Sequence, residues 1–448
     1  MVGSAFELFR IGPGPSSIHV LGPHRAAQRF VHEIAADGML PKVHRVEVEL
    51  FGGLAFSGRD FHTDRAIMAG LTGLSPEHCD NAALARCADR IATEQQLLLA
   101  NGPSVNFAAH RDLRFVVDRA VAYDGNAMRF VVSDRYGEVL ASRVYFSTGH
   151  GHVVGENDRP AATTIRLPYR FVSADAMLEV CSSQGKRVAD LARANECIRR
   201  SPDEVRVALL HVAMVMRAAL QRGLTTEGML PSGNRRTAPS WSAAMRDAAV
   251  AEAGHGALAQ RAALYATAVA EENAAGGRIV TAPSSGSAGP VAALLQLWFD
   301  STPLKYDDGV VDFLLVSTAI GGMLRAAGVA NVGCQSEIGV AAAMAAAGYA
   351  SVLGASNAQI VHAAELALRP HLGLTCDPAA GRIEEPCIER SALAASRACA
   401  AALTAVRTPS PRNGIDATIR AMVASGLVMA SRHKSTSLAG VAVNLAEC

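Results

Sequence analysis

Apolar and polar residues alternate along several stretches in the first third of the chain. Residues 43–50, VHRVEVEL, show the period of two that a half-buried strand requires. Residues 114–123 are a second strand candidate, and residues 127–147 form two β-rich runs around a glycine-containing turn, which predicts a hairpin. Helical patterns lie between them at 24–37 and 75–100, the second opening with a serine and a proline. This part of the chain is therefore predicted to be mixed α/β.

The pattern changes after a stretch rich in glycine, aspartate and proline. Residues 151–164 are predicted to be a linker between a domain at 1–150 and a domain at 165–448. Beyond the linker, strand-like runs nearly disappear, and Ala, Leu, Met and Glu recur at helical spacing. Residues 338–355 are mostly Ala and Gly, which predicts a buried, closely packed helix and not a membrane span. The expected fold class is α+β with two domains, the second mainly helical.

Composition and charge narrow the class of protein. Half of the 448 residues are hydrophobic, which is enough for a large buried core. The formal net charge is +1 with both signs mixed along the chain, which argues against a nucleic-acid partner. No segment has the pattern of a signal peptide. We therefore expect a soluble, cytoplasmic protein with neither a membrane nor a nucleic-acid partner.

Nine cysteines are an odd number, and without an export signal they do not suggest a disulfide framework. Cys376 and Cys387 each neighbour a proline, as cluster-ligating cysteines on loops often do, and Cys334 lies in the loop-like VGCQSEIG. No CxxC spacing is present, so spacing alone leaves metal binding and core burial both open for these three. The other cysteines within helical patterns are expected in the core: Cys79, Cys87, Cys181, Cys197 and Cys399. The terminal Cys448 offers a thiol and a carboxylate as a possible chelate, or is an accident of composition.

Two loops are candidates for binding a ligand or substrate. Residues 271–295 contain a Gly/Ser-rich turn that opens a helix, and its free backbone N–H groups suit a carboxylate or phosphate. The turn lacks the lysine of a Walker A loop and the spacing of a dinucleotide fingerprint, so a plain helix-packing loop is the alternative. Residues 12–27, GPGPSSIHVLGPHRAA, are either a second binding loop or an N-terminal connector.

The motifs in their order resemble the iron–sulfur-dependent, single-chain L-serine dehydratases. They are FELFRIGPGPSS, TDRAI, LPYRFVSADAML, TEGMLPSG, EENAAGGRIVTAP, GCQSEIGVAAAMAAAG, PHLGLTCDPAAG, PCIERSAL and the final cysteine. The resemblance covers essentially the whole chain. It implies an N-terminal α/β domain similar to allosteric-substrate-binding domains, a helical catalytic domain, a small amino-acid substrate and a homodimer.

The resemblance also implies a cofactor. Cys334, Cys376 and Cys387 match three ligands of a [4Fe–4S] cluster whose fourth iron stays open, and Cys448 matches a cysteine that caps that iron until substrate displaces it. The open iron would coordinate the β-hydroxyl of L-serine and assist its loss while a base takes the Cα proton. The resulting enamine tautomerises and hydrolyses to pyruvate and ammonia. The substrate carboxylate is expected at the Gly/Ser-rich loop, on Thr281, Ser284, Ser285, Gly286 and Ser287.

The N-terminal loop becomes, by the same resemblance, a wall of the substrate site. The residues expected to contact substrate there are Ser16 and Ser17, and those expected to be catalytic are His19, His62 and Asn126. His150 is an alternative base, and His371 is expected to support the metal site from beside the ligands.

Several positions depart from the family pattern, and four of them bear most on the choice of substrate. Ile18 and Val20 stand where hydroxyl residues are usual, and Phe61 and Asp124 stand where histidines are usual. A lost polar contact to a small polar substrate costs about 1–3 kcal/mol. Three hypotheses follow: an L-serine dehydratase with a rearranged acid/base set, a relative that eliminates from a different β-substituted amino or hydroxy acid, and a non-catalytic cluster-binding sensor.

Overall fold

The computed structural model describes residues 3–100, 102–117, 125–158, 166–248, 255–302, 306–328, 332–409, 411, 414–434, 440 and 443. The chain forms two compact units, each assembled from segments far apart in sequence. Unit 1 comprises Met1–Arg10, Ile165–Ala274 and Ile279–Cys448, and unit 2 comprises Ile11–Thr164 and Ala275–Arg278. The architecture is α+β, with a mixed sheet in the N-terminal part of the chain.

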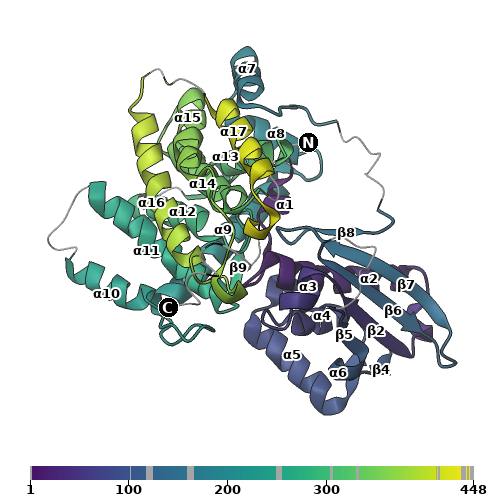
Figure 1. Ribbon diagram of the computed structural model, residues 1–448. Coiled ribbons are helices and arrows are strands. Elements are labelled where there is room, and N and C mark those ends of the chain that lie inside the picture. The colour runs from purple at the N-terminus through teal and green to yellow at the C-terminus, as the bar shows by residue number, and fades with distance from the viewer. Residues whose placement is uncertain are drawn as a thin grey trace. The chain divides into compact units, whose positions relative to one another are not determined.

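Unit 2 is built on a five-stranded sheet of order β5-β2-β6-β7-β8 (Figure 1). The strands are β2 (Arg45–Leu50), β5 (Leu113–Phe115), β6 (Ala127–Ser133), β7 (Val139–Ser147) and β8 (Val153–Gly155). β2 runs parallel to β5, and the other neighbours are antiparallel. The strand expected at 43–50 and the hairpin expected at 127–147 are therefore confirmed. β5 covers only the start of the strand expected at 114–123, and residues 118–123 lie outside the described residues.

Helices and short elements complete unit 2. They are β1 (Ile11–Pro13), η1 (Ser17–Leu21), α2 (Gly22–Ala36), η2 (Leu40–Lys42), α3 (Gly53–Ser57), α4 (Thr63–Leu71), η3 (Pro76–His78), α5 (Asn81–Glu94), β3 (Gln96–Leu98), β4 (Ser104–Asn106) and α6 (Ala109–Asp112). The helix expected at 24–37 is confirmed as α2, which packs on α4 and on β7. Phe30 of α2 stacks on Phe130 of β6 with ring centroids 5.1 Å apart, which fixes the helix on the sheet.

Two expectations for this part of the chain are corrected. The helix expected at 75–100 is divided, because Ser75 and Pro76 open only a short 3-10 turn and Asp80 then caps α5 by accepting a 2.8 Å bond from the N–H of Ala83. The chain leaves α5 at Glu94 and continues as strand β3. The stretch expected to be a linker contains β8, because its backbone pairs with the end of β7 and extends the sheet.

Unit 1 is helical. Its helices are α1 (Ala5–Leu8), α7 (Ala174–Gln184), α8 (Val188–Glu196), α9 (Pro202–Thr225), α10 (Ala238–Ala248), α11 (His255–Ala274), α12 (Gly289–Ser301), α13 (Tyr306–Ala326), α14 (Ile338–Val352), α15 (Asn357–Leu368), α16 (Cys387–Val406) and α17 (Ile415–Val428), with the short strand β9 (Arg278–Val280) before α12. Helix α14 is buried along most of its length and packs against α13, α15 and α16. A Cβ on Gly348 would lie 2.9 Å from the backbone oxygen of Phe313, so α13 and α14 approach closely. The buried, closely packed helix expected at 338–355 is confirmed.

The cysteines expected in helix cores are mostly there. Cys87, Cys181 and Cys399 are buried within α5, α7 and α16. Cys79 is buried but follows the end of η3, and Cys197 is partly exposed at the C-terminal end of α8. Helix α8 ends at Glu196 and Cys197 is its C-cap residue, so the expectation that this thiol lies in the core is wrong.

Two helices are long and apolar enough to cross a membrane by length and composition, α9 and residues 307–326 of α13. The most apolar window of α13 is 78% buried within unit 1, and α9 packs against α11 and α13. Helices at the centre of a globular unit have these same properties.

The buried His24 of α2 makes the stability of the fold sensitive to acid. Its side chain is fully buried, and Nε2 lies 2.6 Å from the Leu74 carbonyl oxygen. Burial lowers the pKa of His24 to about 4 from 6.5, and Arg25 acts in the same direction. Between these two values the unfolded chain binds a proton that the folded chain does not, so stability is lost as pH falls through that window. We expect the free energy of unfolding of wild type to fall more steeply from pH 6.5 to 4.5 than that of His24→Gln, by up to about 1.4 kcal/mol per pH unit.

Urea unfolding of the full chain at several pH values measures this difference. His110, which is exposed on α6, provides the matched control, because His110→Gln should keep the steep wild-type dependence. Equal pH slopes for wild type and His24→Gln would contradict the expectation.

Candidate active site

Three cysteines from different segments meet in unit 1. Cys334 is buried in a 3-10 turn (η4, Cys334–Ser336), Cys376 lies in the loop after α15, and Cys387 is the first residue of α16. Burial raises the pKa of the Cys387 thiol well above its ordinary value, and the neighbouring Cys334 and Cys376 raise it further. Burial also raises the pKa of Cys334, to about 11. The three residues that the sequence singled out are therefore close enough to repel one another as thiolates.

A donor set of this kind fits a metal cluster better than a single ion. Among the described residues, no three His, Cys, Asp or Glu side chains converge closely enough to hold one metal ion. In a cluster each thiolate binds a different iron, so its ligands stand further apart than those of one ion. Bound iron would also offset the burial and the repulsion from neighbouring thiols that raise the pKa of Cys387. The trio of thiols, of which Cys334 is buried and the other two are partly buried, therefore suits an iron–sulfur cluster in its chemistry.

Two charged side chains among the thiols were missed by sequence reasoning. Glu337 interacts electrostatically with Cys334 and Cys387, and Arg390 does so with the same two residues. Glu337 follows Cys334 by three residues, and Arg390 follows Cys387 by three residues on α16. The spacing of three, which puts two helical residues on one face, was the signal that could have found Arg390.

The Gly/Ser-rich loop lies between β9 and α12, as its sequence suggested. Ser287 holds the loop together, since its hydroxyl accepts a 3.2 Å bond from the N–H of Ser284 and lies 3.2 Å from the carbonyl oxygen of Ala282. The Ser285 hydroxyl is buried and has no hydrogen-bond partner among the described residues. A buried hydroxyl without a partner costs free energy unless a ligand or water satisfies it, so Ser285 points to a binding function.

Glu337 connects this loop to the cysteines. The Ser284 hydroxyl donates a 2.9 Å hydrogen bond to Glu337 Oε2, and a Cβ on Gly286 would lie 3.6 Å from the same oxygen. Burial raises the pKa of Glu337, and the bond from Ser284 opposes this shift. The loop and the thiols therefore border one region of unit 1. Thr281 lies at its edge, where its hydroxyl donates to the Leu8 carbonyl at 2.7 Å and accepts from the Arg10 N–H at 2.9 Å.

The C-terminal segment runs along the same region. The N–H of Cys376 donates a 2.8 Å bond to the carbonyl oxygen of His433, and Cys376 and Lys434 form a parallel bridge. A Cβ on Gly440 would collide with the carboxylate of Asp377, so the backbone passes directly beside that residue. Cys448 lies outside the described residues, eight positions beyond Gly440. A chain of that length reaches at most about 28 Å.

His371 ends the short 3-10 turn η5 (Arg369–His371) that follows α15. Its side chain is buried, and Nδ1 is 2.8 Å from the Ala367 carbonyl oxygen. A Cβ on Gly339 would touch its Cβ at 3.0 Å, which packs His371 on the first turn of α14. Burial lowers the pKa of His371, so the ring is neutral at neutral pH. Its role beside the metal ligands stays a prediction.

His19 is the centre of a second cluster, in unit 2. It lies in a π-helical turn, η1, of a kind that is frequent at functional sites. Nδ1 is 3.2 Å from the Ser16 hydroxyl, and Nε2 is 2.9 Å from the Ser57 hydroxyl. Phe61 stacks on the ring with centroids 4.5 Å apart. Burial lowers the pKa of His19 to about 4, so the ring is neutral at neutral pH.

Asn126 belongs to this His19 cluster. A Cβ on Gly53 would collide with Asn126 Oδ1 and would lie 3.9 Å from His19 Nε2, so the two side chains flank the same glycine. Ser16 and Ser17 are both buried at the start of the turn, where Ser16 caps it by accepting from the N–H of His19. The structure thus brings together Ser16, His19 and Asn126 in one unit.

The other N-terminal candidates are in different surroundings from His19, or lie outside the described residues. His62 is exposed and is the N-cap residue of α4, where its backbone has the left-handed conformation with φ of 55°. The neighbouring Phe61, and not His62, stacks on His19. His150 lies in the turn between β7 and β8 with φ of 51°. Val20 is 1% exposed, so its side chain belongs to the core of unit 2, whereas Ile18 is half-buried. Asp124 lies outside the described residues.

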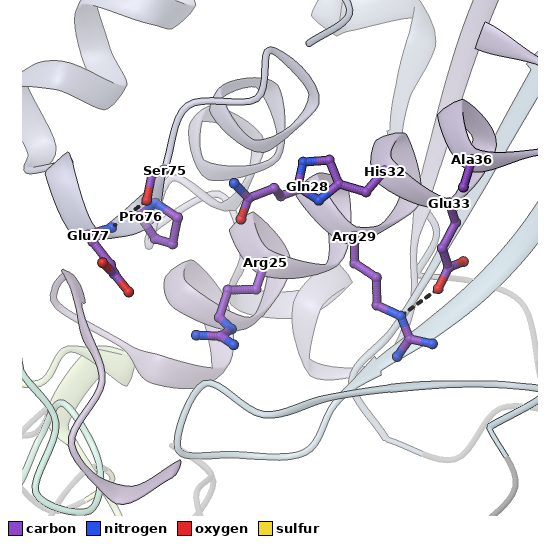
Figure 2. Close-up of a pocket in the computed structure, with 9 residues that line it drawn as sticks. All are labelled: Arg25, Gln28, Arg29, His32, Glu33, Ala36, Ser75, Pro76 and Glu77. Atoms are coloured by element: carbon purple, nitrogen blue, oxygen red, sulfur yellow. Dashed lines mark hydrogen bonds and ion pairs between the residues drawn. The ribbon is translucent and has the colours of Figure 1, made fainter. Parts of the chain in front are cut away.

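A cavity of about 430 Å³ lies along α2 in unit 2, away from these candidates (Figure 2). Its charged lining residues are Arg25, Arg29, Glu33 and Glu77. Arg29 is bonded to Glu33 and to Asp158, and Arg25 interacts electrostatically with Glu77. The charges of this cavity are therefore balanced within unit 2, and none of the residues expected to be catalytic lines it.

Comparison with known proteins gives full-length matches. Residues 183–442 match the family model described as the serine dehydratase alpha chain, and residues 4–158 match that of the serine dehydratase beta chain. The chain is 39% identical over 459 residues to an L-serine dehydratase of Streptomyces coelicolor, covering 100% of each chain. It is 37% identical over 456 residues to L-serine dehydratase 2 of Escherichia coli, covering 99% of each. It is also 39% identical over 465 residues to an L-serine dehydratase of Mycobacterium bovis, covering 100% of this chain and 99% of the relative.

Proposed function

Because this chain belongs to the serine dehydratase family, we propose that it is a lyase that converts L-serine to pyruvate and ammonia. The meeting of Cys334, Cys376 and Cys387 beside the Ser285 loop supports this function most directly. One side chain, Glu337, bonds to the loop and interacts electrostatically with two of the thiols, so substrate held by the loop would lie near whatever the thiols bind.

The three cysteines would hold a [4Fe–4S] cluster. When bound, a cluster with three protein ligands supplies a Lewis-acidic iron that stabilises a departing hydroxyl. Cys387 is suited to this as the first residue of α16, because a helix N-terminus stabilises a thiolate. Cys448 is proposed as the protein's own occupant of the fourth position. The path of the C-terminal segment past Cys376 and Gly440 supports that assignment.

The Gly/Ser-rich loop would bind the substrate carboxylate. Ser285 offers the buried hydroxyl that lacks a partner, and Gly286 leaves the space in front of Glu337 open. Ser284 and Ser287 would hold the loop in shape, because their hydroxyls bond to Glu337 and to the loop backbone. Thr281 would act in the same way, by fixing the segment at Leu8 and Arg10.

His19 is proposed as the base that accepts the Cα proton. The Ser57 hydroxyl donates to the Gly53 carbonyl at 3.0 Å, so its oxygen is left to accept from His19 Nε2–H. This tautomer leaves the lone pair on Nδ1, beside the Ser16 hydroxyl. Asn126, Ser16 and Ser17 would orient polar groups around it, and His62 stays the alternative base.

Anaerobic reconstitution of the full chain with iron and sulfide, followed by assay of pyruvate, tests this function. We expect L-serine to give pyruvate and ammonia in equal amounts. Turnover of another β-hydroxy amino acid but not L-serine would favour the relative with changed specificity, for which the half-buried Ile18 next to His19 is the remaining structural argument. A protein that holds a cluster and turns over none of them would be a non-catalytic sensor.

Removal of the Ser285 hydroxyl should weaken substrate binding and leave the fold intact. Because this buried hydroxyl has no partner within the described residues, Ser285→Ala loses no internal hydrogen bond. Loss of a bond to a carboxylate costs about 1–3 kcal/mol, which is about one to two decades in affinity. We expect KM for L-serine to rise about tenfold or more in steady-state assays, with the thermal midpoint unchanged.

Ser287→Ala is the matched control. Its hydroxyl bonds to the Ser284 N–H and lies 3.2 Å from the Ala282 carbonyl oxygen, so its loss should lower the thermal midpoint. If Ser285→Ala lowers the thermal midpoint as much and leaves KM unchanged, Ser285 is a structural residue.

A homodimer and a cytoplasmic location, both implied at the sequence level, stay predictions. Size-exclusion chromatography with light scattering tests the first and cell fractionation tests the second.

A further inference from the structure

Arg390 is a buried cation that the proposed chemistry does not use. It lies on α16 one turn after Cys387, and its side chain is only 17% exposed. A guanidinium this deep in a protein needs hydrogen-bond acceptors to offset the loss of water. The groups that accept hydrogen bonds from the Arg390 guanidinium indicate the role of this residue.

Its partners lie on the segments that carry the other two cysteines. One guanidinium nitrogen, Nη1, donates a 2.8 Å bond to the carbonyl oxygen of Thr375, the residue before Cys376. The other, Nη2, lies 3.3 Å from Asp377 Oδ1, the residue after Cys376. The same side chain also hydrogen-bonds to Cys334. A single side chain therefore joins the segments of all three cysteines.

The geometry requires arginine in particular. The planar guanidinium carries five N–H donors in a fixed fork, so it can serve a carbonyl, a carboxylate and a sulfur at once. Lysine carries the same charge on a single nitrogen and lacks the fork. Asp377 is only 2% exposed and orients the guanidinium, and the backbone at Gly440 lies against the far side of that carboxylate. Asp377 therefore fixes the guanidinium of Arg390, and the guanidinium in turn holds the segments that carry the cysteines.

A hydrogen bond from a cation to a ligand sulfur affects the electronic state of a cluster. Reduction adds negative charge to the cluster, and donors to its sulfurs stabilise that charge and raise the reduction potential. We propose that Arg390 is a positioning residue that joins the three cysteine segments into one site and raises the reduction potential of the cluster they hold. This inference rests on the proposed presence of that cluster.

Redox titration of the full, anaerobically reconstituted chain, followed by electron paramagnetic resonance, tests this. Arg390→Gln should make the cluster about tenfold harder to reduce, a shift to more negative potential of about 59 mV for one electron. It should also shorten the lifetime of the visible cluster absorbance in air, because the three ligands are less firmly held. Arg390→Lys should recover part of the potential, through its charge, but little of the lifetime. Arg420→Gln on α17, an exposed arginine of the same unit, should match wild type.

The outcomes separate this proposal from the proposed function. If Arg390→Gln keeps the wild-type potential and lifetime, the proposal is wrong, while turnover of L-serine by wild type still stands. If Arg390→Gln does not fold, Arg390→Lys decides, since a wild-type potential and lifetime in that variant would also overturn the proposal. If wild type itself binds no iron and sulfide, the proposed cluster and the proposed role of Arg390 are both wrong.

Discussion

Cys387→Ser should abolish both the visible absorbance of the reconstituted cluster and the release of pyruvate from L-serine. Cys387 is the first residue of α16, and its thiol lies among those of Cys334 and Cys376. Serine keeps the size of the side chain and removes the sulfur that iron prefers. Loss of even a group that supports a metal ligand costs about 10–100-fold in metal affinity or activity, so loss of the ligand should reduce turnover to background. Iron and sulfide analysis with a pyruvate assay measures both effects.

Cys399→Ser is the matched control on the same helix. Cys399 is fully buried further along α16, and it interacts with none of the three thiols. Its replacement should lower stability, because a hydroxyl replaces a buried thiol, while iron content and turnover per folded chain persist. A Cys387→Ser protein that keeps wild-type iron content would remove Cys387 from the ligand set.

The elements with strong periodicity could be predicted from sequence. The strand at β2 and the hairpin of β6 and β7 followed from alternation, because one face of that sheet is covered by α2 and must be apolar. The buried helix α14 followed from its Ala and Gly content, since small side chains allow helices to approach closely.

Contacts between distant segments could not be predicted in this way. The first residues of the chain belong to the helical unit, where the Ser4 hydroxyl donates a 2.8 Å bond to Glu196. β8 was hidden within a Gly- and Asp-rich stretch because its two valines are too short a run to predict a strand, and its pairing with β7 shows only in the fold. Glu337 was missed because a charged residue near a loop is normally solvated, and only the fold shows that it lies near the thiols. Arg390 could have been found from its position three residues after Cys387 on one helix.

The structure shows what surrounds two of the residues that depart from the family pattern, Val20 and Phe61. Val20 is buried in the core of unit 2, so the apolar residue there meets other protein atoms and does not bear on substrate choice. Phe61 stacks on the His19 ring with centroids 4.5 Å apart. The apolar residue at this position therefore packs against the proposed base and helps to fix the orientation of its ring.

His19→Asn should lower kcat for L-serine by about 10²–10⁴-fold, the usual contribution of a positioned general base. Burial lowers the pKa of His19 to about 4, so at neutral pH the wild-type ring is neutral and one of its nitrogens carries a lone pair. Asparagine can still bond to Ser16 or Ser57 but cannot accept the Cα proton. Steady-state assays on reconstituted protein with matched iron content measure the loss, and KM should change less than kcat because the carboxylate loop is intact.

Two further variants decide whether His19 or its neighbour is the base. His62→Asn should leave kcat within a few-fold of wild type, because that side chain is exposed and Phe61 stands beside His19 in its place. Ser57→Ala removes a partner of Nε2 and should cost about tenfold or less, since the ring is then held less firmly but keeps its basic nitrogen. The reverse pattern, with kcat lost in His62→Asn and kept in His19→Asn, would transfer the proton-accepting role to His62 and leave the His19 cluster as a structural core of unit 2.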